Sequence, residues 1–122
     1  AHEYAGMTAA AAQIRAAGAP VMLVGPFTTA IRDRSAWAQW VAQLGGEPMY
    51  LVWVGCREVV LRDRIMARDS RWDDAKLASW DEFVARQQPT QPPPVRHTAI
   101  DNSGDLGALV AQITRVVVDR GW

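Results

Sequence analysis

Short apolar runs alternate along this chain with segments whose apolar residues recur at helical spacing. The runs at 21–24, 48–55 and 95–100 have the length and composition of buried strands. Apolar residues spaced three and four apart predict helices in the remaining segments. We expect these helices over residues 3–17, 37–44, 57–71, 75–87 and 106–117. A polar break over residues 69–74 lies between the third and the fourth of them.

This order of helices and strands predicts an α/β fold with parallel strands covered by helices, in a single domain over residues 1–122. Right-handed crossovers place the carboxyl ends of all parallel strands at one edge of a sheet. We therefore expect the segments 25–34, 55–71 and 101–105 to converge on one crevice, where open α/β sheets bind ligands.

Composition narrows the classes of function. Lys and Arg together number 13, as do Asp and Glu, so the formal net charge is zero. The protein would then have no overall electrostatic field to attract nucleic acid or a membrane. We therefore do not expect nucleic acid to be a partner. Cys56 has no second cysteine to pair with, which fits a reducing, cytoplasmic compartment. His2 and His97 have no cysteine or carboxylate at ligand spacing, so no metal site is expected.

The segment after the 48–55 run carries a stripe of arginines. If the helix stays regular at about 100° per residue, four arginines fall within about 60° of one another. They are Arg57, Arg64, Arg68 and Arg71. Planar guanidinium groups offer paired donors that match phosphate oxygens, so this stripe is a candidate anion grip. A solvated helix whose arginines pair with its own acidic residues is the alternative reading, and it stays open.

Two further stretches are candidates for binding. Arg32 and Arg34, with Thr28 before them, would lie at the mouth of the crevice and could hold an acidic acceptor; a surface pair with Asp33 at a helix start is the alternative. Asn102, Ser103 and Gly104 could surround a base with backbone groups, although such residues before a helix are also ordinary caps.

These motifs resemble the P-loop phosphotransferases of the small-molecule and nucleoside kinase group. The run 61–69, Leu-Arg-Asp-Arg-Ile-Met-Ala-Arg-Asp, is similar to the start of the lid in dephospho-coenzyme A kinases. The run 99–106, Ala-Ile-Asp-Asn-Ser-Gly-Asp-Leu, resembles their last strand and adenine-side loop. The run 21–28 with Arg32, Asp33 and Trp37 is closer to polynucleotide-kinase-like ATPases.

The resemblance implies a three-layer α/β/α parallel sheet with a lid-like helical segment over residues 57–88. It implies a kinase that takes ATP or GTP with magnesium as donor and a small hydroxyl-bearing or nucleotide-like acceptor. Arg64, Arg68 and Arg71 would be its catalytic lid arginines, and Asn102, Ser103 and Gly104 would bind the nucleotide. Thr28, Arg32 and Arg34 would bind the acceptor.

The sequence departs from this family at two points. It contains no G-x-x-x-x-G-K-[ST] loop, and Gly25 stands where the family has an acidic residue. The family also places the glycine-loop strand between the strands expected here at 21–24 and 48–55. Either those two strands pair directly, or roughly sixty further residues precede Ala1, which we favour. We expect the 122 residues alone to be inactive, and a catalytically inactive binding module is the alternative function.

Overall fold

The computed structural model describes residues 4–122, and it divides the chain into two compact units. The first unit comprises the residues up to Leu51 together with Pro93–His97. The second unit comprises Val52–Pro92 and Thr98–Trp122. His2 and Glu3, on which a metal prediction and the start of the first helix fall, lie outside the described residues.

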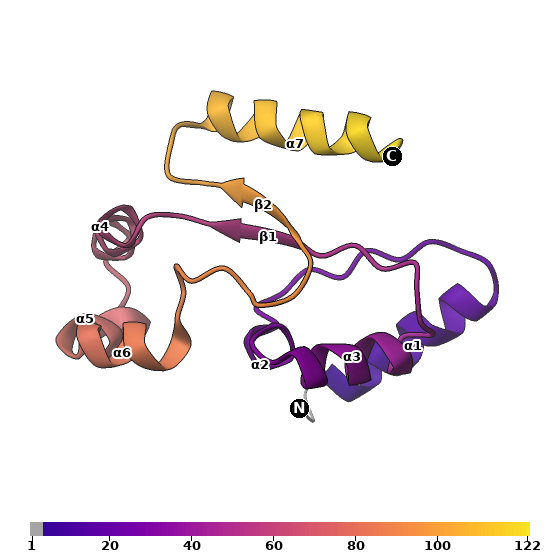
Figure 1. The fold of residues 1–122 in the computed structure, drawn as a ribbon. Helices are drawn as coiled ribbons and strands as arrows, with labels where there is room; N and C mark the ends of the chain where they lie inside the picture. The colour runs from indigo at the N-terminus through magenta and orange to yellow at the C-terminus, as the bar shows by residue number, and fades with distance from the viewer. Residues whose placement is uncertain (1–3) are drawn as a thin grey trace. The chain divides into compact units, whose positions relative to one another are not determined.

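In its described residues the first unit contains the α-helices α1 (Ala5–Ala16), α2 (Thr28–Ile31) and α3 (Arg34–Gln43) (Figure 1). Asp33 begins α3, because its carboxylate accepts hydrogen bonds from the backbone N–H groups of Ser35 and Ala36. The core contains Ala11, Ile31, Val41 and Leu44. Aromatic rings of Tyr4, Phe27, Trp40 and Trp37 form a chain of neighbours with centroid separations of 4.9–5.9 Å. The helices expected at 3–17 and 37–44 are thus confirmed.

The strand expected at 21–24 is wrong, because this segment has no regular secondary structure. Met22 is 82% exposed and Val24 is 85% exposed, whereas Val21 and Leu23 are half-buried. The segment therefore has the alternating exposure of a strand without a strand's hydrogen bonds. Direct pairing between this segment and the 48–55 run, one of our two expectations, is likewise not formed.

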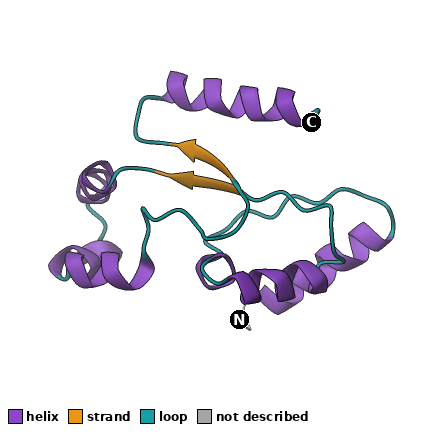
Figure 2. Ribbon diagram, in the orientation of Figure 1, coloured by secondary structure: helices purple, strands orange, loops and turns teal. Residues whose placement is uncertain are grey.

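The second unit is built on a two-stranded parallel sheet (Figure 2). β1 (Val52–Gly55) pairs with β2 (Thr98–Asp101), with Val52 opposite Thr98 and Gly55 opposite Asp101. α7 (Leu106–Arg120) follows β2 and packs along it (Figure 1). The chain is therefore α/β with parallel strands, as the alternation of patterns predicted, and its described residues contain these two strands only.

Between the two strands the chain forms α4 (Glu58–Arg68), the 3-10 helix η2 (Arg71–Asp73), α5 (Asp74–Ala78) and α6 (Trp80–Gln87). α4 ends because Asp69 adopts a left-handed conformation, with φ at 48°. Arg57 precedes α4 in extended backbone and Arg71 follows its end, so the regular helix carries only Arg64 and Arg68 of the expected stripe. The helix expected at 75–87 is divided at Ser79 into α5 and α6.

Candidate anion pocket at the strand ends

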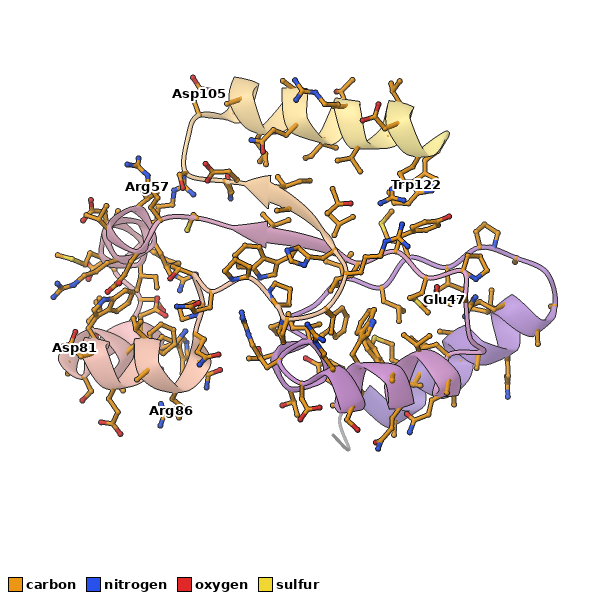
Figure 3. The ribbon with its side chains drawn as sticks, in the orientation of Figure 1. Glu47, Arg57, Asp81, Arg86, Asp105 and Trp122 are labelled. Atoms are coloured by element: carbon orange, nitrogen blue, oxygen red, sulfur yellow. The ribbon has the colours of Figure 1, made fainter. Side chains whose placement is uncertain are left out.

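The carboxyl ends of β1 and β2 lie together at one edge of the sheet, and the loops that follow them are hydrogen-bonded to each other. The N–H of Asn102 donates to the carbonyl of Gly55 at 2.7 Å. The N–H of Arg57 donates to Oγ of Ser103 at 2.8 Å. Figure 3 shows Arg57 where β1 leads into α4, and Asp105 where the second loop leads into α7. The segments 55–71 and 101–105 therefore converge as expected.

The second of these loops is fixed by its own side chains. The N–H of Ser103 donates to Oδ1 of Asp101 at 2.9 Å, and Asp105 caps α7 by accepting from the N–H of Ala108 at 2.8 Å. Gln112, in the second turn of α7, accepts from the N–H of Asp101 and donates to its carbonyl. The loop is thus held in one shape from both of its ends.

A cavity of about 320 Å³ opens at this edge. Its walls come from the strand ends, with Gly55, Cys56 and Asn102, and from one side of α4, with Arg64, Ile65 and Arg68. We call it the arginine pocket. Two of the three predicted catalytic arginines and one of the predicted nucleotide-binding residues therefore line the same cavity.

Arg64 connects α4 to the loop after β2. Its Nη1 donates to the carbonyl of Asn102, and its Nη2 donates to the carbonyl of Gly104 at 3.1 Å. The predicted nucleotide-binding residues Asn102, Ser103 and Gly104 are thus already joined to Arg64 and Arg57. Each carbonyl oxygen keeps a second lone pair for another donor.

Arg68, one turn further along α4, is held by a buried carboxylate. Its Nε and Nη2 donate to the two oxygens of Asp73, both at 2.8 Å. Lys76 donates to Oδ1 of the same carboxylate at 3.3 Å. Asp73 is 2% exposed, whereas the side chain of Arg68 is 57% exposed. The guanidinium of Arg68 is therefore bonded to a buried carboxylate, while more than half of the Arg68 side chain stays exposed.

Two carboxyl groups around the pocket have lowered pKa values. Burial opposes the charged form of Asp73, but the hydrogen bonds and charges of Arg68 and Lys76 outweigh it and lower the pKa of this carboxyl. Hydrogen bonds from Ser103 lower the pKa of Asp101, helped by the charges of Arg57 and Arg64. Both groups are therefore carboxylates at neutral pH.

The remaining predicted site residues lie elsewhere. Arg71 belongs to η2, where its guanidinium lies 5.5 Å from the ring centroid of its exposed neighbour Trp72. Thr28, Arg32 and Arg34 belong to the first unit. Arg34 donates from Nε to the carbonyl of Pro94 at 2.9 Å, Thr28 donates to the carbonyl of Pro26 at 3.1 Å, and burial lowers the pKa of Arg32.

Sequence reasoning missed the role of Asp73. The pair Asp73 and Asp74 before a helix has the sequence of an ordinary helix cap, yet the Asp73 side chain makes no capping bond to α5. The signal that could have found it is weak. Arg68 and Asp73 are five residues apart across the end of α4, a spacing that brings side chains together only after the left-handed turn at Asp69.

Residues that could hold a metal or assist catalysis are few around the pocket. Among residues 4–122, no three His, Cys, Asp or Glu side chains gather as a metal site would require. In that same part of the chain no helix is both long and apolar enough to cross a membrane.

Comparison with models of known families, with curated proteins and with solved structures finds no match for this chain.

Proposed function

We propose that the arginine pocket receives the phosphates of a nucleoside triphosphate, and that the chain supplies the lid side of an NTP-dependent phosphotransferase. One observation carries this proposal. Arg64 and Arg68, one helical turn apart, line a single cavity at the carboxyl ends of two parallel strands. That edge is where open α/β sheets hold ligands, and guanidinium groups are the donors best matched to phosphoryl oxygens.

The size of the pocket favours the phosphate part of the ligand. A volume of about 320 Å³ is at the lower end of the roughly 300–1,000 Å³ of small-molecule sites. We expect the phosphates to enter the pocket and the base to lie outside it, beside the loop of Asn102, Ser103 and Gly104. The shape of that loop is fixed by Arg64, Asp101 and Gln112, so it offers a preformed edge to a planar ring.

The chemistry that these residues can perform is electrostatic. Negative charge grows on the oxygens around a transferred phosphoryl group, and donors already aimed at those oxygens stabilise the transition state. Arg68 is suited to this role because its contact with Asp73 leaves N–H donors that the two bonds do not use. Arg64 would act closer to the loop, where it already holds two carbonyls.

The three-layer architecture expected from the sequence is part of the same proposal. We infer a three-layer α/β/α sheet of the P-loop type, supported by parallel β1 and β2 with α4 and α7 following them. Thr28, Arg32 and Arg34 of the first unit remain the proposed acceptor-binding residues. ATP or GTP would be the donor. Magnesium would come with it, since Mg²⁺ in such sites is held mainly by the substrate phosphates.

A nucleotide- or partner-binding module without catalysis is the second candidate. The sequence favours it at two points, since it contains no glycine loop ending in Lys-Ser or Lys-Thr and has Gly25 where an acidic residue is expected. On the first proposal these 122 residues bind phosphate by themselves, and on either proposal they are not expected to turn over ATP. A glycine loop encoded in the reading frame upstream of Ala1 would favour the kinase, and a start codon there would favour the module.

Calorimetric titration of inorganic tripolyphosphate and of Mg-ATP tests the pocket directly. We expect an Arg64→Ala/Arg68→Ala variant to lose at least tenfold in affinity, because a hydrogen bond to a charged group contributes about 1.5–3 kcal/mol. Arg115→Ala is the matched control, since Arg115 lies on α7 and does not line the pocket. Equal affinities for the wild type, the double variant and the control would overturn the proposal.

A further inference from the structure

Asp73 holds Arg68 in a way that differs from an ordinary surface ion pair. The carboxylate contacts two nitrogens of the guanidinium: Oδ2 lies 2.8 Å from both Nε and Nη2, and Oδ1 lies 2.8 Å from Nη2. Contacts from two nitrogens to one carboxylate fix the plane of the guanidinium as well as its position. Because the Asp73 side chain is only 3% exposed, water competes little for its oxygens. The pair therefore sets the orientation of Arg68.

The two-point contact uses one side of the guanidinium. An arginine has five N–H donors, and the bonds to Asp73 take one on Nε and one on Nη2. The two hydrogens on Nη1 and the second on Nη2 take no part in these bonds. The outer side of Arg68 is thus left for another acceptor, on a residue that lines the arginine pocket.

Lys76 makes this arrangement compatible with a bound anion. It contacts Oδ1 of Asp73 at 3.3 Å, so one carboxylate is shared by two cations. The three side chains together carry a net charge of +1, because two positive groups face one negative group. Asp73 can therefore orient Arg68 without cancelling the positive charge that would attract phosphate.

The hydrogen bonds of the Asp73 carboxylate go to cations and not to the helix that follows it. Asp73 stands at the N-terminal boundary of α5, yet its side chain makes no capping bond there. Within residues 4–122 its carboxylate accepts hydrogen bonds from Arg68 and Lys76. A capping residue would direct its carboxylate to backbone N–H groups. This carboxylate is directed at the guanidinium instead.

We propose that Asp73 is the positioning residue for Arg68, and that it presents the outer N–H donors of the guanidinium to the phosphates in the arginine pocket. This inference rests on the proposed function, because it needs a polyphosphate in that pocket. Asp73 itself does not touch the ligand. It acts through Arg68, and the contact between the two persists when the ligand is bound.

Nitrogen-15 NMR of the arginine side chains in the wild-type chain tests this persistence. Addition of inorganic tripolyphosphate should shift the Nη signals of Arg68 and leave its Nε–H signal in place, since Nε stays bonded to Asp73. An Nε–H signal that moves as much as the Nη signals would mean that the anion replaces Asp73. That result would overturn the inference, and it does not depend on any variant folding.

Calorimetry with the same probe tests the contribution of Asp73. We expect Asp73→Asn to bind tripolyphosphate at least fivefold more weakly than the wild type, even though it adds a positive charge to the net balance. Asp119→Asn is the matched control, because it makes the same charge change on α7 at a side chain that does not line the pocket. At about 0.15 M salt, where surface charges are screened beyond about 8 Å, it should change affinity less than threefold.

The outcomes separate the two proposals. If wild-type protein does not bind tripolyphosphate, the proposed function fails and this inference fails with it. If wild-type protein binds and Asp73→Asn binds as tightly or more tightly, only the inference is overturned. Tighter binding by Asp73→Asn would identify Asp73 as a competitor that holds Arg68 away from the anion.

Discussion

Two apolar runs in this chain have similar sequences and different structures. Residues 21–25 read Val-Met-Leu-Val-Gly, and residues 51–55 read Leu-Val-Trp-Val-Gly. The second run forms β1, whereas the first forms no strand. Both have exposed side chains, since Val24 is 85% exposed and Val54 is 55% exposed. Burial of side chains therefore does not separate them.

The difference lies in the hydrogen bonds of the backbone. β1 pairs with β2 in parallel register, and the pairing continues past the strand through the bond from Asn102 to the carbonyl of Gly55. Residues 21–25 have no such ladder. A buried strand must satisfy its N–H and C=O groups, so an apolar run becomes a strand only where a second strand is present. The same pairing brings the arginine pocket together.

The largest expected effect comes from removing the core of the paired region. Ile100 in β2 is 4% exposed, and truncation of a buried isoleucine to alanine costs about 2–5 kcal/mol. We expect Ile100→Ala to lower the free energy of unfolding by about 2–4 kcal/mol in urea titrations followed by circular dichroism. Val24→Ala is the matched control and should stay within about 0.5 kcal/mol. Equal losses in the two variants would contradict the comparison.

A smaller effect is expected at the glycines that end the two runs. A Cβ added to Gly55 would lie 2.5 Å from the ring of Trp53, so the ring would have to move. Overpacking of this kind costs about 1–3 kcal/mol, and we expect Gly55→Ala to fall at the lower end. At Gly25 the nearest atom is in the Phe27 ring, at 3.1 Å, and Gly25→Ala should cost less than about 1 kcal/mol. A larger loss of stability for Gly25→Ala than for Gly55→Ala in thermal unfolding would contradict this difference between the two glycines.

Much of the fold followed from local patterns, and the exceptions have physical causes. α1, α3, α4 and α7 were predicted from apolar spacing, and β1 and β2 from short apolar runs. The strand at 21–24 was wrong because pattern alone does not tell whether a pairing partner exists. The helix at 75–87 was divided because Ser79 leaves the helical conformation, with φ at −126° and ψ at 52°.

The candidate site was predicted in part. Strand ends and helical spacing together placed Arg64 and Arg68 in one pocket with Asn102. The same spacing placed Arg71 on their stripe, and this failed because the left-handed turn at Asp69 ends α4. Asp73 was beyond prediction because its contact with Arg68 depends on that turn. Local periodicity describes regular elements and does not describe the geometry after they end.

A third test of the comparison concerns the loop after β2, to which Arg64 of α4 is hydrogen-bonded. Arg64→Ala removes the bonds to the carbonyls of Asn102 and Gly104. We expect the local opening free energy of this loop to fall by about 1 kcal/mol, the typical net contribution of an exposed hydrogen bond. Amide hydrogen exchange at residues 102–105 measures it, with the amides of Gly25 and Phe27 as internal reference. Unchanged exchange at 102–105 would show that Arg64 does not hold the loop.

The smallest effect is expected from acid, at the carboxyl that ends β2. Bonds from Ser103, with the charges of Arg57 and Arg64, lower the pKa of Asp101 in the folded chain, while the unfolded value is about 3.9. A lowered folded pKa gives stability that is present above the unfolded pKa and is lost as the pH falls through the folded pKa. Asp101→Asn should therefore lose less stability than wild type between pH 5 and pH 2 in urea titrations, approximately the range in which this carboxyl takes up its proton. Asn keeps an oxygen that can accept from the Ser103 N–H, so the loop keeps its shape while the charge is removed.

The carboxyl of Asp73, whose pKa is also lowered, still titrates in the variant, so a residual loss in acid is expected. An acid loss in Asp101→Asn equal to that of wild type would mean that the loop after β2 is held by its backbone bonds alone, and that the charges around the arginine pocket do not stabilise the paired strands.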